Sequence, residues 1–83
     1  MLDFKHFVTR GVVLSVYRES LKLASSFSDA SMRRDMTLLM KEEFRPFREA
    51  RAQNRLLSQE DTDYTLAKVR QRINEVKRIK EMV

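Results

Sequence analysis

Arginine side chains are the groups in this chain best suited to do chemistry. Arg10 lies in a first helix-like stretch, and Arg45 and Arg48 follow a second one, across a short connection centred near residues 27 and 28. Helices joined by a short connection pack as antiparallel neighbours, so residues equidistant from it lie side by side. We therefore expect Arg10 opposite Arg45, with Arg48 one turn further along. Clustered guanidinium groups make charge-assisted, often bidentate hydrogen bonds to carboxylates and phosphates.

The same arginines have acidic neighbours at Glu42, Glu43 and Glu49. Most clusters of opposite charge are solvated faces that contribute little, so a ring of surface ion pairs is an equal interpretation of the spacing. No combination of nucleophile, base and orienting group can be assembled from the sequence, and no glycine-rich phosphate loop is present. The pattern predicts a binding protein rather than an enzyme, with no metal site.

An apolar trough is expected behind the arginines. Methionines at 32, 36 and 40 recur in steps of four, which favours an ordinary core. The alternative is a deformable wall for a flexible ligand such as an acyl chain. Residues 12–17 are almost entirely apolar, so this part of the helix must be covered on more than one side. The predicted lining is Leu14, Tyr17, Leu21, Met36, Leu39, Met40 and Phe44.

Three helices account for the pattern, at about residues 3–24, 30–46 and 59–82. Asp3 is expected to cap the first helix, and the Ser58 to Asp61 stretch resembles a capping box for the third. Pro46 lacks an amide hydrogen and clashes with the preceding turn, so the second helix should stop or kink at Arg45. An irregular or further helical turn is expected over 46–57. Gly11 either admits another backbone closely or is simply tolerated, at about 1 kcal/mol.

The composition bounds the fold and the partners. Eighty-three residues make one all-α domain, 1–83, and a chain this short buries about 60–65% of its unfolded surface, so its core is marginal. It has no cysteine and thus no disulfide framework. A net charge of +5 favours an acidic partner. No apolar run approaches the ~20 residues that cross a bilayer, so no transmembrane segment is expected.

Residues 14–18, LSVYR, resemble the signature of the LYR-motif family of small mitochondrial proteins, with Val16 replacing the first leucine of the motif. Residues 42–45, EEFR, and 60–62, EDT, extend the resemblance over nearly the whole chain. The start, residues 4–10, looks like the LYR motif-containing protein 2 branch of that family. The chain departs from the family at residues 46–57, which look longer and contain a proline.

The resemblance implies a three-helix antiparallel bundle with a cleft for an acyl chain. Proteins of this family bind the mitochondrial acyl carrier protein, whose acyl-4′-phosphopantetheine arm inserts between the helices, and no cofactor is bound directly. The pair then serves as an assembly factor or accessory subunit of a complex such as respiratory complex I or the mitoribosome, in the mitochondrial matrix. By position, the carrier-binding residues would be Arg10, Tyr17, Arg18, Arg45 and Arg48.

Plain alternatives remain for these residues and for the function. Tyr17 could be a core residue with its hydroxyl bonded locally, and Arg18 a surface cation beside Glu19. The basic third helix could bind nucleic acid, although it lacks stacking aromatics and helix-turn-helix spacing. The chain could also be a purely structural subunit without lipid. The host complex does not follow from the sequence.

Overall fold

The computed structural model describes residues 4–83, with side chains from Thr9 onward. It contains four helices, α1 (Phe4–Ser25), α2 (Ala30–Glu43), α3 (Arg45–Ala52) and α4 (Gln59–Met82). No strand occurs within 4–83, so the described chain is all-α, as predicted. The helix beyond the three that were predicted is α3, which begins at Arg45. It occupies part of the segment 46–57, where the sequence predicted an irregular or further helical turn. The expected cap at Asp3 lies outside the described residues.

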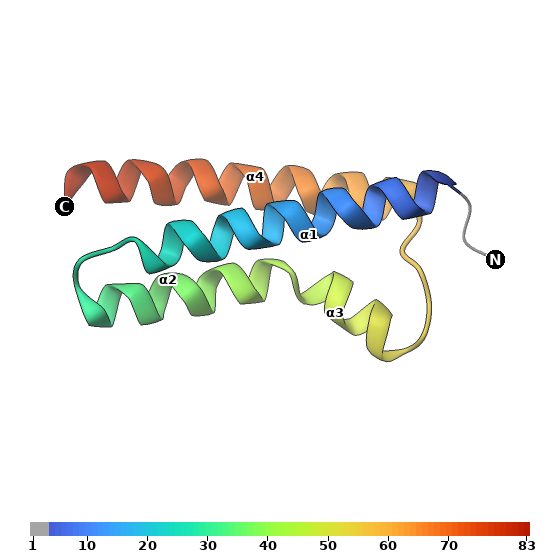
Figure 1. Cartoon of the computed structure of the whole chain (residues 1–83), viewed down its shortest axis with the longest axis horizontal. Coiled ribbons are helices and arrows are strands. Elements are labelled where there is room, and N and C mark those ends of the chain that lie inside the picture. The colour runs from blue at the N-terminus through green and yellow to red at the C-terminus, as the bar shows by residue number, and fades with distance from the viewer. Residues whose placement is uncertain (1–3) are drawn as a thin grey trace.

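The three long helices run alongside one another, and α3 stands apart (Figure 1). α2 returns antiparallel to α1, and after α3 and a connecting segment α4 runs back antiparallel to α2. The resulting body is elongated, measuring 46 × 20 × 16 Å. Because α3 turns away from the line of α2, α2 does not continue alongside the start of α1 (Figure 1).

Side-chain caps set the starts of α2 and α4. The Asp29 carboxylate accepts a hydrogen bond of 3.0 Å from the amide of Met32, and the Ser58 hydroxyl accepts one of 3.1 Å from the amide of Asp61. Each satisfies an amide that has no partner within its helix. Glu60 and Asp61 also place negative charge at the positive end of α4. The predicted cap at Ser58 is therefore confirmed.

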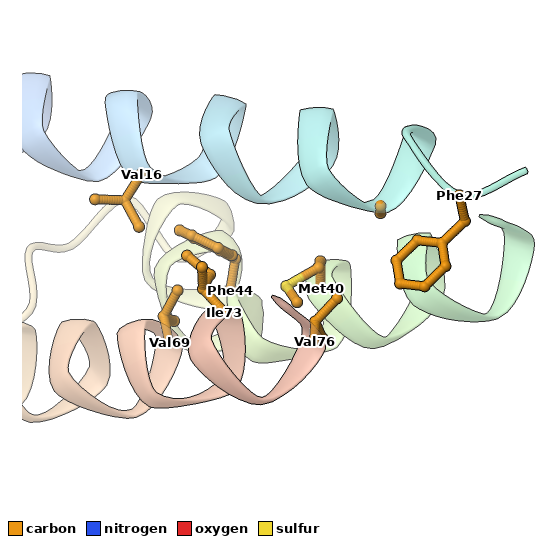
Figure 2. Packing of buried hydrophobic residues seen from close by; sticks show 8 residues of the cluster. Val16, Phe27, Met40, Phe44, Val69, Ile73 and Val76 are labelled. Atoms are coloured by element: carbon orange, nitrogen blue, oxygen red, sulfur yellow. The ribbon is translucent and has the colours of Figure 1, made fainter. Parts of the chain in front are cut away.

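The core is a single cluster between α1, α2 and α4 (Figure 2). Met40 of α2 lies fully buried beside Val76 of α4, and Phe27 closes the end next to the first turn. On α1 the most buried positions are small: Ser20 and Ala24 have no exposed surface, and the Ser20 hydroxyl donates to the carbonyl of Tyr17 at 2.7 Å. The complete buried apolar cluster is Val16, Ala24, Phe27, Met40, Phe44, Val69, Ile73 and Val76.

The apolar stretch of α1 is covered on one side only. Val16 is buried in the core, whereas Val12 and Leu14 keep 36% and 41% of their surface exposed. The expectation that this stretch is covered on more than one side is thus not met by the chain's own described residues. Two large apolar side chains are left partly exposed to solvent, which favours a partner or ligand at this helix.

One ion pair ties the end of α2 to α4. Arg72 donates from Nε to Glu43 at 3.0 Å and from Nη1 to Glu75 at 2.9 Å. The hydrogen bond to Glu43, which is the main cause, raises the pKa of Arg72 above its ordinary value. Glu43 is therefore held by α4, so it does not contribute to the arginines predicted at this end of α2.

No helix within the described residues is both long and apolar enough to span a bilayer.

Gly11 has nothing within 4 Å of the place where a Cβ would stand. No second backbone approaches it, so it is tolerated rather than required for packing. We expect Gly11→Ala to raise the free energy of unfolding by about 1 kcal/mol, because alanine restricts the unfolded chain and favours the helix. Urea unfolding followed by circular dichroism measures the change, and a loss of stability would contradict this account.

Met40 and Leu38 provide a matched pair on α2, since Met40 is fully buried and Leu38 is 60% exposed. Met40→Ala removes atoms from a filled core and should cost about 2–5 kcal/mol of unfolding free energy. Leu38→Ala should change it by less than about 0.5 kcal/mol. Urea midpoints at an unchanged denaturant slope would test this; equal effects of the two substitutions would show that Met40 does not lie in the core.

Candidate functional site

A recess of the described structure lies between α1, α3 and the segment that leads to α4. It has a volume of about 690 Å³, within the range of roughly 300–1,000 Å³ that is typical of ligand pockets. We call it the arginine groove. Its lining residues are Thr9, Arg10, Val13, Leu14, Tyr17, Phe44, Phe47, Arg48, Ala50, Arg51, Asn54, Arg55, Leu56, Leu57 and Thr62.

The groove exists because α2 ends early. The backbone of Phe44 leaves helical geometry, at φ −92° and ψ 5°, and its carbonyl starts a new helix by accepting from the amides of Phe47 and Arg48. Pro46 then occupies the first turn of α3, where its missing amide hydrogen costs nothing. The break falls one residue earlier than the sequence predicted, at Phe44 instead of Arg45.

Three aromatic rings from three segments form the wall of the groove nearest the core. The ring centroids of Tyr17 and Phe44 are 4.9 Å apart in an edge-to-face arrangement, and those of Phe44 and Phe47 are 6.0 Å apart. Edge-to-face pairs contribute about 0.5–1.5 kcal/mol beyond the burial of their area. Phe44 therefore has two roles: it is 5% exposed in the core, and it lines the groove. Tyr17 is half-buried and likewise lines the groove while packing against the core cluster.

The end of α3 is closed by a backbone motif that shapes the far side of the groove. The amide of Arg55 donates to the carbonyl of Ala50 at 2.9 Å, and that of Asn54 donates to Arg51 at 3.0 Å. This pair of bonds is the Schellman motif, which requires a left-handed residue after the cap. Asn54 fills that position with φ 57°. The chain then reverses, so Leu56 and Leu57 return as part of the groove lining.

Four arginines line the groove, namely Arg10, Arg48, Arg51 and Arg55, and no aspartate or glutamate is among its lining residues. None of the four forms an ion pair with a side chain that the structure describes. The side chain of Arg55 is oriented by a hydrogen bond of 2.5 Å from Nε to Oε1 of Gln53. The apolar walls are thus bordered by unneutralised positive charge.

Arg45 lies away from the other predicted arginines. Its Nε donates to Glu49 at 2.8 Å and its Nη1 donates to Glu42 at 3.0 Å, on the exposed side of the break. These bonds, with Glu49 the larger contributor, raise the pKa of Arg45 above its ordinary value. Of the two interpretations considered, surface ion pairing describes Arg45, whereas Arg10 and Arg48 meet at the groove. The difference arises because the break at Phe44 gives the residues of α3 other directions than they would have if α2 continued as one helix.

Arg18 is exposed and is not part of the groove lining, although its neighbour Tyr17 is. Successive residues of a helix point about 100° apart, and at this position the next residue after Tyr17 points out of the recess into solvent. Arg18 is therefore separate from the groove arginines, and its implied contact with the carrier stays a prediction.

The predicted apolar trough divides in two. Leu14 and Phe44 line the groove together with Tyr17. Met40 is fully buried, and Leu21, Met36 and Leu39 pack against the core cluster instead of lining the recess. Met32 packs there too, so the methionine stripe is ordinary core. The reason is geometric: α2 carries these residues where three helices are close together, and the recess opens only beyond its end.

Arg51, Asn54 and Arg55 are among the groove residues that were not predicted. Their only sequence signal is Gln53-Asn54 after an apolar-periodic run, since asparagine is one of the few residues that tolerates a left-handed conformation. Thr62, a buried polar residue of the first turns of α4, also lines the groove and had no signal of its own.

Comparison with known proteins finds no matching family model, no matching curated protein and no matching solved structure. The function is therefore argued from the groove. Its apolar walls, solvent-facing Leu14 and Leu56, and arginine border suit a ligand or partner with an alkyl part and an anionic part.

Substitutions of Asn54, the left-handed residue, test whether the Schellman motif closes α3 at the groove. Asn54→Ala should lower the free energy of unfolding by about 1 kcal/mol, because a Cβ without a local hydrogen-bonding group disfavours positive φ. Asn54→Gly should be neutral or stabilising, since glycine adopts this conformation freely. Urea unfolding of the two variants provides the comparison, and equal stabilities would argue against the Schellman motif at the end of α3.

Proposed function

We propose that this chain is a non-enzymatic adaptor that binds the mitochondrial acyl carrier protein and receives its acyl-4′-phosphopantetheine chain. One observation carries the proposal: a recess of about 690 Å³ with aromatic and aliphatic walls has four arginines and no carboxylate in its lining. The carrier is acidic and presents an alkyl chain on a phosphate-containing arm, so its chemistry complements both parts of the site. The resemblance of residues 14–18 to the LYR motif supports the same partner.

The arginines and the apolar walls of the groove would contribute differently to the complex with the carrier. The arginines would favour association, and the walls would supply binding energy. Arginines that form no ion pair with the side chains of residues 9–83 can bond to carboxylates on the carrier, which mainly favours rapid and selective association. An acyl chain in the groove contributes about 0.8 kcal/mol for each buried methylene, or about 8 kcal/mol for ten before ordering costs. A domain with a marginal core gains stability by the same binding energy. Of the predicted carrier contacts, Arg10, Tyr17 and Arg48 line the groove.

The path of the acyl chain is limited by the space that core side chains already occupy. Met40, Val69 and Val76 are fully buried between the three long helices, so this region offers no room in the unbound form. The acyl chain would lie beside Leu14 and over Tyr17 and Phe44, between α1 and α3. In this proposal α3 replaces the end of a longer second helix and makes one wall of an acyl-chain cleft.

The pair of this chain with the carrier would serve as an assembly factor or accessory subunit of a complex in the mitochondrial matrix, respiratory complex I or the mitoribosome. The compartment and the host rest on the family resemblance alone. The nucleic-acid alternative has less support, because Arg72, Lys77 and Lys80 of α4 are engaged with Glu43, Glu19 and Ser26 inside the chain. A mitoribosomal host would still bring RNA near the surface.

A charge placed in the apolar wall tests the proposal. Leu14→Asp should weaken binding of a myristoylated acyl carrier protein by tenfold or more, because the carboxylate neutralises the arginines and disrupts the path of the alkyl chain; tenfold corresponds to about 1.4 kcal/mol. Isothermal titration of purified proteins measures the affinity. Leu14 is 41% exposed, so the variant is expected to fold.

Leu38→Asp is the matched control, since Leu38 is 60% exposed on α2 and lies outside the groove. It makes the same change of charge and should leave the affinity unchanged. The wild-type chain should also prefer the myristoylated carrier to the carrier with a bare phosphopantetheine arm. Equal binding of the two carrier forms would point to a structural subunit without lipid, and no binding of either form would refute the proposal.

A further inference from the structure

The four arginines of the groove differ in how the backbone places them. Arg10 and Arg48 come from the bodies of α1 and α3, whereas Arg51 and Arg55 stand on either side of Asn54 in the closing turn of α3. The carbonyl of Arg51 and the amide of Arg55 both take part in the Schellman motif. Their positions are thus determined by the turn, which keeps both residues in the groove lining.

The side chain of Arg55 is also partly oriented in advance. Its Nε is committed to Gln53, while the structure gives its two terminal nitrogens no acceptor among the described residues. A guanidinium group has five N–H donors, so those two nitrogens retain the forked pair that matches a carboxylate or a phosphate. Orientation before binding reduces the entropy lost when the ligand is held.

We propose that Arg51 and Arg55 form an anion subsite, by which the groove selects single-chain amphiphiles with an anionic head group and binds free long-chain carboxylates without any carrier. An alkyl tail would extend from this end along Leu56 and Leu14 toward Tyr17 and Phe44. The inference rests on the proposed function in that it takes the same groove as the ligand site. It adds the class of head group and the residues that select it.

Charge complementarity is the reason for choosing this occupant. A neutral lipid would leave the four groove arginines without an anionic partner among the described side chains. An acidic protein surface alone would leave the recess unfilled. A free fatty acid and a carrier-tethered acyl chain share an alkyl tail and an anionic group, a carboxylate in one and a phosphodiester in the other. The experiment therefore includes both sources.

The test compares myristate with myristyl alcohol, which share a tail and differ in charge. The wild-type chain should bind myristate at least tenfold more tightly than the alcohol, measured by displacement of a fluorescent fatty acid below the concentration at which micelles form. Arg51→Gln combined with Arg55→Gln should reduce this ratio to about two or less, with little effect on the alcohol. Both residues are exposed, and circular dichroism verifies that the double variant folds.

Arg34→Gln combined with Arg78→Gln is the matched control, because both residues are exposed and lie outside the groove. It lowers the net charge equally and should preserve the ratio. Overturning results would be a wild-type ratio near one, or an equal fall of the ratio in the control pair, which would reduce the effect to overall charge. An unchanged ratio in the Arg51 and Arg55 pair would also overturn the subsite and leave these residues as stabilisers of the helix end.

A parallel binding measurement with the myristoylated carrier separates this inference from the proposed function. Binding of the myristoylated carrier by a wild-type chain that does not bind free myristate would refute the subsite and leave the adaptor role standing. Selective binding of myristate without binding of the carrier would support the subsite and refute the adaptor role. Absence of both would refute both.

Discussion

The early end of α2 at Phe44 is the constraint on which the rest of the structure depends. A helix continued through this point would need an amide hydrogen that Pro46 does not have, and the proline ring would collide with the carbonyl of Glu42. The chain resolves the conflict by restarting a helix from the carbonyl of Phe44. The new axis of α3 leaves the line of α2 (Figure 1). The core residues lie between the three long helices, and the groove lies beyond the end of α2.

The packed core between the long helices and the groove beyond α2 have different roles: the core stabilises the fold, and the groove is the proposed binding site. Between the long helices, Met40 and Val76 pack beside small residues of α1 and supply the stability that an 83-residue chain can obtain from its own core. Beyond Phe44, apolar walls face solvent, and a ligand there would add burial that the chain itself lacks. Stability and binding are therefore expected to be linked, because ligand binding to the native state favours that state.

Charge is partitioned by the same break. Glu42 and Glu49 pair with Arg45 on the outer side of the bend, and Glu43 is taken up by Arg72 of α4. The acidic residues that could have neutralised the arginines near the end of α2 are thus committed elsewhere. The groove keeps four arginines and no carboxylate in its described lining, a sign and density of charge that an acidic or phosphate-bearing partner complements.

Local signals determined the helical class, the cap at Ser58 and the interruption near Pro46, because periodicity, capping and the chemistry of proline act within a few residues. They also indicated that Arg10 and Arg48 would meet. The direction of α3, the burial of Met36 and Met40 in place of lining a cleft, and the entry of Arg51 and Arg55 into the groove required the tertiary structure. These features depend on how far one axis turns at Phe44 and on the left-handed Asn54, and spacing along the chain contains neither angle.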